Sequence, residues 1–404
     1  MHESRRLDKS SSSNGPPCPS CRSRNTILFH RIDDVPVNSV VNVRSRTEAL
    51  NFPRGNIALR FCHACGFVFN ASFNPKLIHY SSDCEESQGY SPTFNAFAHQ
   101  LAEHLVHQYD LHGKKILEIG CGKGEFLDLI CELGSNQGIG FDPAYVEGRT
   151  GDNRDHHLTF VKDYYSDKYA SYTADVICCR MTLEHIPDTA AMVQTVRKAI
   201  GGNLDTLVFF QVPDAMRIMR DCAFEDIYYE HCSYFSTASL AQLFKHNGFE
   251  VLDLRTDYNG QYIMLEAKPS SAGHSGDAMP GNERGEFRKY VDQFSRRFKE
   301  KTGHWSKSLK RIRGQGKKVV LWGSGSKGVA FLTALNGGKD VEYVVDINPF
   351  RQGTYMAGTG QRVVSPQHLK EYLPDVVIIM NTIYRNEIKQ DLDQMGLQPE
   401  ILTL

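Results

Sequence analysis

The sequence lacks the features that would tie it to a membrane, to secretion or to nucleic acid. No apolar run approaches the roughly 20 residues of a membrane-spanning helix, and residues 1–17 are polar and serine-rich, without an apolar signal core. No long block of one charge occurs either, since 46 Lys and Arg nearly balance 47 Asp and Glu. We therefore predict a cytoplasmic protein whose partner is a small molecule, with no membrane or nucleic acid as the main partner.

The chain of 404 residues is too long for one ordinary hydrophobic core, which predicts two or three domains. We expect a disordered tail over residues 1–17 and a small cysteine-containing module over residues 18–75. A catalytic α/β domain then covers residues 76–268, and a linker rich in Ser, Gly and Pro covers residues 269–283. Residues 284–404 are expected to form a helical bridge and a second α/β domain.

Apolar runs alternate with helical periods in both α/β domains, which indicates mostly parallel sheets with helices on both faces. In the first domain we expect a helix over residues 94–105, strands over residues 115–119, 137–141, 175–179 and 206–210, and an antiparallel pair over residues 249–254 and 262–266. Apolar residues from Phe287 to Ile312 predict one or two bridging helices. In the second domain we expect strands over residues 318–322, 341–345 and 375–380.

Four of the eleven cysteines form two short turns, Cys18-x-x-Cys21 and Cys62-x-x-Cys65, separated by a polar stretch with β-prone patches such as residues 39–43. An odd number of cysteines without a secretory signal favours reduced thiols over disulfides. Two such turns let four thiolates reach one tetrahedral ion, which is the coordination that Zn²⁺ prefers. Because the protein would fill all four positions, we predict a structural zinc site. The alternative is a set of reduced core cysteines spaced by chance.

A glycine-rich turn follows the first predicted strand of the catalytic domain, in the sequence Glu118-Ile119-Gly120-Cys121-Gly122-Lys123-Gly124. Glycines let the backbone approach a ligand closely and lead into a helix whose free N–H groups can hold a carboxylate or phosphate. Asp142 ends the next predicted strand, where an acidic side chain accepts hydrogen bonds from ribose hydroxyls. This spacing predicts a nucleoside ligand, against the alternative of a purely structural turn.

The Gly-x-Gly-x-Gly turn after Leu-Glu-Ile-Gly resembles motif I of class I S-adenosylmethionine-dependent methyltransferases more than the Gly-x-Gly-x-x-Gly turn of dinucleotide-binding proteins. This resemblance implies that S-adenosylmethionine is the cofactor and that Asp163 contacts its adenine. The implied cofactor-binding residues are Glu118, Gly120, Gly122, Gly124, Asp142 and Asp163. The segment from Glu184 to Asp188 follows a strand that ends near Arg180, at the sheet edge where α/β proteins bind ligands.

The segment from Asp226 to Ser236 holds the strongest candidates for catalysis. Methyl transfer to carbon needs a base that removes a proton next to a carbonyl and a group that holds the resulting oxyanion. His231 can be this base near neutral pH, Glu230 can orient it or a substrate hydroxyl, and Tyr228 can donate to the enolate or assist deprotonation. The alternative is ordinary packing, which is typical of aromatic-rich stretches with one His.

Across nearly its full length the chain resembles the sugar C-methyltransferases that act on nucleotide-activated keto-deoxysugars in bacterial antibiotic pathways. That family joins a four-Cys zinc module, a class I methyltransferase domain with an Ile-Tyr-His-Glu-His-x-Ser-Tyr-Phe-Ser segment, and a C-terminal Rossmann-like domain. Residues 227–236 keep this segment except for its first His, which is Tyr229 here. The resemblance implies a catalytic set in which His231 is the base, together with Tyr228, Glu230 and, from ahead of the methyltransferase domain, Tyr90 rather than Tyr80.

In the second α/β domain, the turn Gly323-Ser324-Gly325-Ser326-Lys327-Gly328 resembles the Gly-x-x-x-Lys-Gly turn of the same family. Taken alone, this turn with Asp346 after the next strand is typical of an NAD site. The resemblance instead implies that the domain grips the nucleotide of the sugar, with Ser324, Lys327 and Asp346 as substrate-binding residues and Lys327 on a phosphate. The alternative is a vestigial domain with a structural role only.

Two departures from the family bear on the substrate. The chain has Gly120 to Gly124 where the family commonly has an Ala-Ser-Asn-Asp-Gly turn, and Asn259-Gly260-Gln261-Tyr262 where the family has His-Gly-Gly-Ser. The second departure leaves open a different activated sugar or another keto compound as acceptor.

We therefore predict an α/β protein in which a class I methyltransferase Rossmann-like domain lies between a small N-terminal zinc module and a second, C-terminal Rossmann-like domain. It is expected to methylate a carbon α to a ketone on a nucleotide-activated deoxysugar, by enolate formation and in-line transfer. Two alternatives stay open at this point: an O- or N-methyltransferase of a small metabolite, and a non-catalytic nucleotide-binding scaffold.

Overall fold

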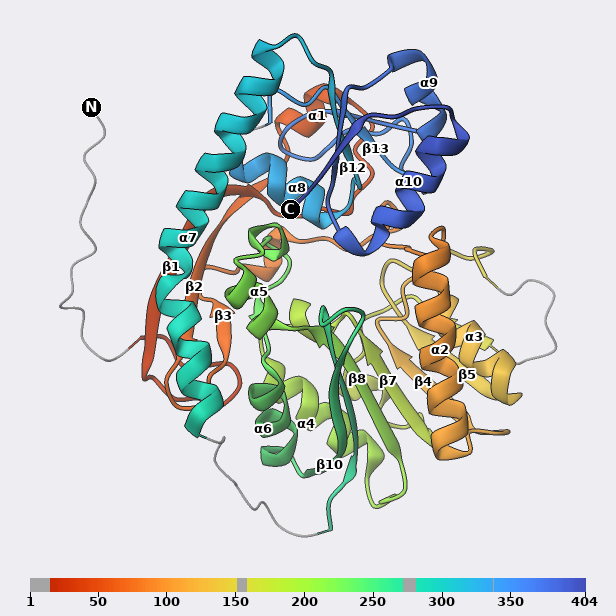
Figure 1. Cartoon of the computed structure of the whole chain (residues 1–404). Helices are drawn as coiled ribbons and strands as arrows, with labels where there is room; N and C mark the ends of the chain where they lie inside the picture. The colour runs from red at the N-terminus through yellow and green to blue at the C-terminus, as the bar shows by residue number, and fades with distance from the viewer. Residues whose placement is uncertain (1–14, 151–157, 272–280, 337) are drawn as a thin grey trace.

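The computed structural model of the chain describes residues 15–150, 158–271, 281–336 and 338–404, which form three β-sheets in an N-terminal, a central and a C-terminal part (Figure 1). Residues 1–14 of the predicted tail and residues 272–280 of the predicted linker lie outside the described residues. Within the described ranges, no helix is both long enough and apolar enough to cross a membrane. The predicted α/β fold class, with two Rossmann-like sheets, is confirmed.

The N-terminal part is an antiparallel sheet that takes its last strand from the middle of the chain. In spatial order its strands are β1 (Thr26–Pro36), β2 (Arg54–Cys62), β3 (Val68–Asn70) and β9 (Ser233–Tyr234), and the short helix α1 (Arg46–Leu50) precedes β2. The β-prone residues 39–43 form isolated bridges instead of a strand, from Val41 to Cys84 and from Val43 to Tyr355. The β3–β9 pair joins the cysteine-containing module directly to the segment predicted to be catalytic.

The central part is a seven-stranded sheet. Its strands are β4 (Lys115–Ile119), β5 (Gln137–Phe141), β6 (Leu158–Val161), β7 (Val176–Arg180), β8 (Leu207–Pro213), β10 (Phe249–Asp257) and β11 (Tyr262–Pro269). They lie in the order β10-β11-β8-β7-β4-β5-β6, with β4 to β8 parallel and β10 and β11 antiparallel. The strands predicted for this part and the antiparallel pair are all present.

Helices cover both faces of this sheet, which explains why its strands are continuous apolar runs. They are α2 (Pro92–Tyr109), α3 (Glu125–Gly134), α4 (Thr189–Ile200), α5 (Ala215–Asp221) and α6 (Thr237–His246). Leu117 of β4 packs in one hydrophobic cluster with α4 and α6, while its neighbour Ile116 packs in another with α2 and α3. The carboxyl ends of β4, β5 and β7 therefore stay open at one edge, where the predicted motifs lie.

One long helix, α7 (Gly281–Gly314), runs along one side of the molecule toward the C-terminal part (Figure 1). The sequence left open one or two helices here, and the structure has one. Phe287 and Phe294 near its start pack against the N-terminal sheet, whereas Trp305 and Leu309 near its end pack in the C-terminal core. This helix thus fastens the N-terminal module to the C-terminal domain.

The C-terminal part is a parallel sheet with β12 (Val319–Trp322) in the middle. The other strands are β13 (Tyr343–Val345), β14 (Arg362–Val364), β15 (Val376–Ile379) and β16 (Glu400–Thr403), in the order β14-β13-β12-β15-β16, and the helices are α8 (Ser326–Ala334), α9 (Leu369–Tyr372) and α10 (Arg385–Gln394). The three inner strands are where the sequence predicted them. The edge strands β14 and β16 were not predicted from the sequence.

Candidate active site and cysteine cluster

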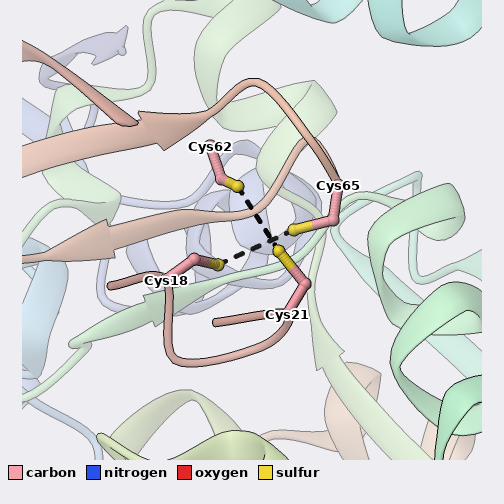
Figure 2. Close-up of side chains that lie close together, drawn as sticks. All are labelled: Cys18, Cys21, Cys62 and Cys65. Carbon is pink, nitrogen blue, oxygen red and sulfur yellow. Dashed lines mark hydrogen bonds between the residues drawn. The ribbon is translucent and has the colours of Figure 1, made fainter. Parts of the chain in front are cut away.

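The four cysteines of the two N-terminal turns lie within reach of one ion (Figure 2). Cys18 Sγ is 3.7 Å from Cys65 Sγ, and Cys21 Sγ is 3.6 Å from Cys62 Sγ. These spacings match the edge of about 3.8 Å that four sulfurs make around a zinc ion at about 2.3 Å. They are too long for disulfides, and all eleven cysteines of the chain are free. The donor set therefore fits a tetrahedral zinc ion.

The backbone around these cysteines explains why two distant turns converge. Gly66 has a left-handed φ of 72° and donates its N–H to the carbonyl of Cys62 (2.9 Å), which closes the turn after β2. Arg22, at φ 64°, donates its N–H to the carbonyl of Cys18 (2.8 Å) in the same way. Each tight turn aims two thiols at the same point, as Figure 2 shows.

A cavity of about 890 Å³ opens where the three parts of the chain meet. Its walls include the Gly120–Gly124 turn after β4, the segment from Tyr228 to His231, and the Gly323–Gly328 turn after β12. The structure thus brings three sequence motifs from distant positions to one space. Its size lies within the range of about 300–1,000 Å³ that is typical of small-molecule sites.

The glycine-rich turn of the central part needs glycine for two reasons. Gly120, Gly122 and Gly124 have positive φ angles of 69°, 56° and 86°. In addition, a Cβ atom on Gly120 would collide with the side chain of Thr182. Asp142, at the end of β5, accepts a hydrogen bond from the N–H of Gly122 (2.9 Å), and burial raises its pKa. The turn and Asp142 therefore form one cradle on the cavity wall.

The other two acidic residues predicted to contact the cofactor have contrasting surroundings, although both line the cavity. Glu118 is 2% exposed, its Oε2 has no hydrogen-bond partner among the described residues, and burial raises its pKa to about 7. Asp163 accepts hydrogen bonds from Tyr169 (2.6 Å) and Lys168 (2.9 Å), which lower its pKa to about 2. Of the two, Glu118 is the buried acceptor that is available to a ligand.

Two tyrosine–histidine pairs face each other in the cavity wall. Tyr228 Oη lies 2.8 Å from Nε2 of His231, and Tyr80 Oη lies 2.8 Å from Nδ1 of His185. The two imidazole rings meet edge to face, with centroids 4.8 Å apart. Oε1 of Glu184 lies 3.9 Å from Nε2 of His231. We call these five side chains, Tyr80, Glu184, His185, Tyr228 and His231, the His231 cluster.

Short connections hold the His231 cluster in place. Glu184 and His185 belong to the 3-10 turn η3 (Leu183–His185), which follows β7 directly. The N–H of Cys232 donates to the carbonyl of Glu184 (3.0 Å), and β9 then pairs with β3. The sequence placed the Glu184 segment at the ligand-binding edge, but it offered no signal that Glu184 and His185 meet His231.

Burial controls protonation throughout the His231 cluster. It lowers the pKa of His231 well below the usual value and that of His185 to about 4, so both imidazoles are neutral near pH 7. It raises the pKa of Tyr228 and of Tyr80 well above the usual value near 10, so both phenols keep their protons. It also raises the pKa of Glu184 to about 8. A neutral imidazole beside a protonated phenol is a pair that can accept a proton.

Glu230 does not orient His231, which was one of the roles expected for it. Its carboxylate accepts hydrogen bonds from the N–H (2.6 Å) and Oγ (2.9 Å) of Ser39, whose Oγ also lies 2.8 Å from Oγ of Ser326. Burial raises the pKa of Glu230 to about 7. Ser39 belongs to the N-terminal part and Ser326 begins α8, so this carboxylate connects all three parts of the chain at the cavity.

The structure places Tyr80, and not Tyr90, in the His231 cluster. Tyr90 lines the same cavity but is 37% exposed, and its ring packs against Phe350 at a centroid distance of 6.4 Å. Both tyrosines line the cavity, so the choice of Tyr90 over Tyr80 as a catalytic residue stays a prediction, although it is Tyr80 that contacts His185 of the cluster. The bridge between Val41 and Cys84 folds the segment after Tyr80 back onto the N-terminal part, a contact that no local pattern reveals.

Ser324 and Asp346 are engaged by protein groups. Ser324 donates its N–H (2.9 Å) and its Oγ–H to Asp346, while Nε of Arg351 donates to Oγ of Ser324 (2.6 Å) and lies 3.8 Å from Asp346. Arg351 also donates to the carbonyl of Glu85 (2.8 Å). Its guanidinium thus sits beside the acid that would bind the ribose of NAD. This arrangement disfavours NAD at the Gly323–Gly328 turn.

Lys327 and Arg217 flank the carboxylate of Asp226 on the cavity wall. Nζ of Lys327 contacts Oδ1 of Asp226, and Nη1 of Arg217 donates to Oδ2 (2.8 Å). Burial acts to raise the pKa of Asp226, but the two cations outweigh it and hold the pKa below the usual value. Lys327 and Arg217 carry two positive charges against the one negative charge of Asp226. The three side chains together can therefore receive an anionic ligand such as a phosphate. Arg217 was not predicted from the sequence.

Two family models match the chain one after the other. Residues 94–254 match a model described as a methyltransferase domain, and residues 282–398 match a model described as a C-methyltransferase C-terminal domain. The first match includes the glycine-rich turn and most of the His231 cluster, and the second includes the Gly323–Gly328 turn.

The chain is also similar to several proteins over part of its length. The C-methyltransferase NovU of Streptomyces niveus is 26% identical over 298 residues, which are 68% of each protein. A ubiquinone biosynthesis O-methyltransferase of Idiomarina loihiensis is 32% identical over 108 residues, 24% of this chain and 43% of that protein. Among solved structures, a magnesium protoporphyrin IX methyltransferase of Synechocystis PCC 6803 with bound SAH has a TM-score of 0.35 at 16% identity, covering 44% of this chain and 84% of that one. A 1,6-didemethyltoxoflavin-N1-methyltransferase of Burkholderia thailandensis has a TM-score of 0.34 at 16% identity, covering 43% and 79%.

Proposed function

Because the chain belongs to the S-adenosylmethionine-dependent methyltransferases with a C-terminal C-methyltransferase domain, we propose that it methylates a carbon α to a ketone, on a nucleotide-activated deoxysugar. One observation carries this proposal: the Tyr228–His231 pair and the Gly120–Gly124 turn line the same cavity. A methyl donor and a base for the acceptor then share one enclosed space.

The residues of the glycine-rich cradle suit the cofactor. S-adenosylmethionine supplies a methyl group bound to a positively charged sulfur. The free N–H groups at the start of α3 suit its carboxylate, and Asp142 suits its ribose hydroxyls. The unpaired oxygen of Glu118 suits a donor on the same ligand. Asp163 stays a proposed adenine contact at the cavity rim.

We infer that Tyr228 and His231 remove the substrate proton together. Tyr228 Oη takes the proton from the carbon next to the ketone while its own proton passes to Nε2 of His231, 2.8 Å away. The C–H bond breaks and its electron pair forms the enolate, whose carbon attacks the methyl group in line. The protonated phenol of Tyr80, in the same cluster, is suited to donate to the enolate oxygen.

For the nucleotide of the substrate we propose Lys327 and Arg217 as the phosphate-binding pair. Both cations line the cavity and share the carboxylate of Asp226. Ser324 and Asp346 are expected to act indirectly, because their hydrogen bonds to each other and to Arg351 shape the turn that carries Lys327.

The extent of the matches favours carbon over oxygen or nitrogen as the methylated atom. The O-methyltransferase relatives match 23–39% of the chain, whereas the C-methyltransferase relative matches 68% of it. The C-terminal domain match adds to this distinction. A scaffold that senses NAD is less favoured, because Ser324 and Arg351 already engage the carboxylate of Asp346.

We further propose that the cysteine cluster binds a structural Zn²⁺, since four thiolates leave no open position for substrate. The free state of all eleven cysteines supports a reducing compartment such as the cytoplasm.

Replacing the proposed base tests this function. The substitution His231→Asn should abolish transfer of labelled methyl from S-adenosylmethionine to a nucleoside-diphosphate-linked 4-keto-6-deoxyhexose, while S-adenosylmethionine affinity stays within about threefold. Mass spectrometry and NMR of the product identify the methylated atom. His112→Asn is a matched control, because that side chain is exposed. Full turnover by the His231→Asn protein would refute the role of His231.

A further inference from the structure

A buried carboxylate without a partner stands next to the proposed base. The side chain of Glu184 is 1% exposed, it lines the cavity, and neither of its oxygens has a hydrogen-bond partner among the described residues. A buried carboxylate with so few donors around it is costly, because little stabilises its negative charge. It persists if it is protonated, or if a positive charge comes to lie beside it.

The geometry of the His231 cluster provides such a charge. Nε2 of His231 lies between Oη of Tyr228, at 2.8 Å, and Oε1 of Glu184, at 3.9 Å. In the proposed reaction a proton reaches this nitrogen through Tyr228. The imidazolium would then form directly beside the carboxylate.

Other titratable groups around Glu184 stay uncharged. They are His185 on the same turn, Cys179 at the end of β7, and Cys232, whose N–H and Sγ contact the carbonyl of Glu184. Burial lowers the pKa of His185 to about 4, and it raises the pKa of both thiols, that of Cys232 to about 12. Lys327, whose positive charge helps to lower the pKa of His231, is paired with Asp226. His231 is therefore the neighbour that turns cationic during the reaction.

We propose that Glu184 is the counter-charge of the methyl-transfer cavity, balancing first the positive sulfur of the methyl donor and then the imidazolium of His231. This inference rests on the proposed function. During transfer the substrate C–H bond breaks, a C–C bond forms, and the S–CH₃ bond breaks with its electrons left on sulfur. The substrate proton ends on Tyr228 and the former phenol proton on His231, so one positive charge has moved from sulfur to Nε2.

The net charge of the cavity is the same before and after methyl transfer. One fixed carboxylate can therefore balance first the positive sulfur and then the imidazolium of His231. Glu184 touches no reacting atom in this scheme, so it is a positioning residue that acts through His231. In the resting protein the carboxyl group of Glu184 holds a proton, which explains why its burial is tolerated there.

Infrared difference spectroscopy of the full chain tests the inference without turnover. The wild-type spectrum minus that of Glu184→Gln should contain a carboxylic-acid C=O band at pH 7. Binding of S-adenosylmethionine should remove this band, while S-adenosylhomocysteine, which lacks the positive charge, should leave it. A band that is absent at rest, or that responds equally to both ligands, overturns the proposal.

Kinetics supply the second readout. Glu184→Gln should lower kcat for the nucleotide-linked keto sugar by about 10²-fold or more, with KM within about threefold, and should remove the ascending limb of the kcat profile with pH. Glu184→Asp should restore part of the rate. Glu266→Gln is a matched control, because this carboxylate on β11 is also 1% exposed and lies outside the cavity. A wild-type rate and pH profile in Glu184→Gln overturn the proposal.

Two further outcomes separate rival explanations. Glu184, His185 and His231 are close enough to hold a metal ion, so metal content is measured in wild type and in Glu184→Gln. The same metal content in both proteins supports the proposal, whereas a metal lost with the substitution overturns it.

Turnover retained in His231→Asn refutes the proposed function itself. Turnover lost in His231→Asn but kept in Glu184→Gln refutes the counter-charge alone.

Discussion

Removing the metal proposed for the cysteine cluster should stop methyl transfer without preventing cofactor binding. The reason lies in the β3–β9 pair, where Val68 and Phe69 pair with Tyr234 and Ser233, two residues after the proposed base His231. The cluster holds the turn between β2 and β3, so loss of the ion releases the strand that fixes the catalytic segment. The Gly120–Gly124 turn follows β4 of the central sheet, and none of the four cysteines belongs to a strand of that sheet.

The expected magnitude is large. A four-thiolate zinc site contributes about 10–16 kcal/mol of apparent binding energy at pH 7, comparable to the whole stability of a domain, which is about 5–15 kcal/mol. If even about 4 kcal/mol of it supports the β3–β9 pair, the opening equilibrium of that pair rises about a thousandfold. The N–H of Asn70, which donates to the carbonyl of Cys232 (2.8 Å), should then lose most of its exchange protection.

The assay combines three measurements on protein treated with a strong chelator and on the Cys65→Ser variant. Metal content and methyl transfer should fall together, amide exchange should accelerate in β3 and β9, and calorimetry should still detect S-adenosylmethionine binding. Cys131→Ala is the control, because this buried cysteine lies in α3 outside the cluster. Metal-free protein that keeps both its activity and the protection of β3 would refute this reasoning.

Three other predictions follow from single positions. Gly120→Ala should weaken S-adenosylmethionine binding by about tenfold or more, measured by calorimetry, because the residue has positive φ and no space for a Cβ atom. Tyr80→Phe should lower kcat by about 10²-fold and Tyr90→Phe by much less, because only Tyr80 bonds His185; equal effects would contradict the cluster. Glu184→Gln should remove a pH dependence of stability measured by urea unfolding at pH 5 and pH 8. Burial raises the folded-state pKa of Glu184 to about 8, so between about pH 4.5 and 8 the folded state binds more protons than the unfolded one. As pH rises through this range, the free energy of unfolding of the wild type should fall by on the order of a few kcal/mol, whereas the variant should keep it.

Local patterns were sufficient for most strands of the two Rossmann-like sheets and for the turns proposed to bind ligands. Strands such as β4 and β8 are apolar runs between helices, and Asp142 follows the glycine turn at the spacing that a nucleoside needs. The spacing of each Cys-x-x-Cys turn indicated its two thiols as ligands of one ion. The contacts of 3.7 and 3.6 Å, however, join thiols of different turns, which only the fold brings together.

The wall of the active site is different, since its residues meet only through tertiary contacts. Ser39 and Glu230 are 191 positions apart and share no motif, yet they form the junction of all three parts. Tyr80 reaches His185 because a bridge at Val41 turns its segment inward, whereas Tyr90, nearer to α2, stays at the rim.

The sequence by itself therefore indicated short-range chemistry: the fold class, and candidates for the metal ligands, the cofactor turn and the base. The tertiary structure alone decided which tyrosine joins the base, that Glu230 links domains, and that Glu184 stands unpaired beside His231. The physical reason is that periodicity and turn spacing act over a few residues. Burial and electrostatic pairing, by contrast, depend on which distant segments pack together, and these shift the pKa of His231, His185 and Glu184 in the cavity wall.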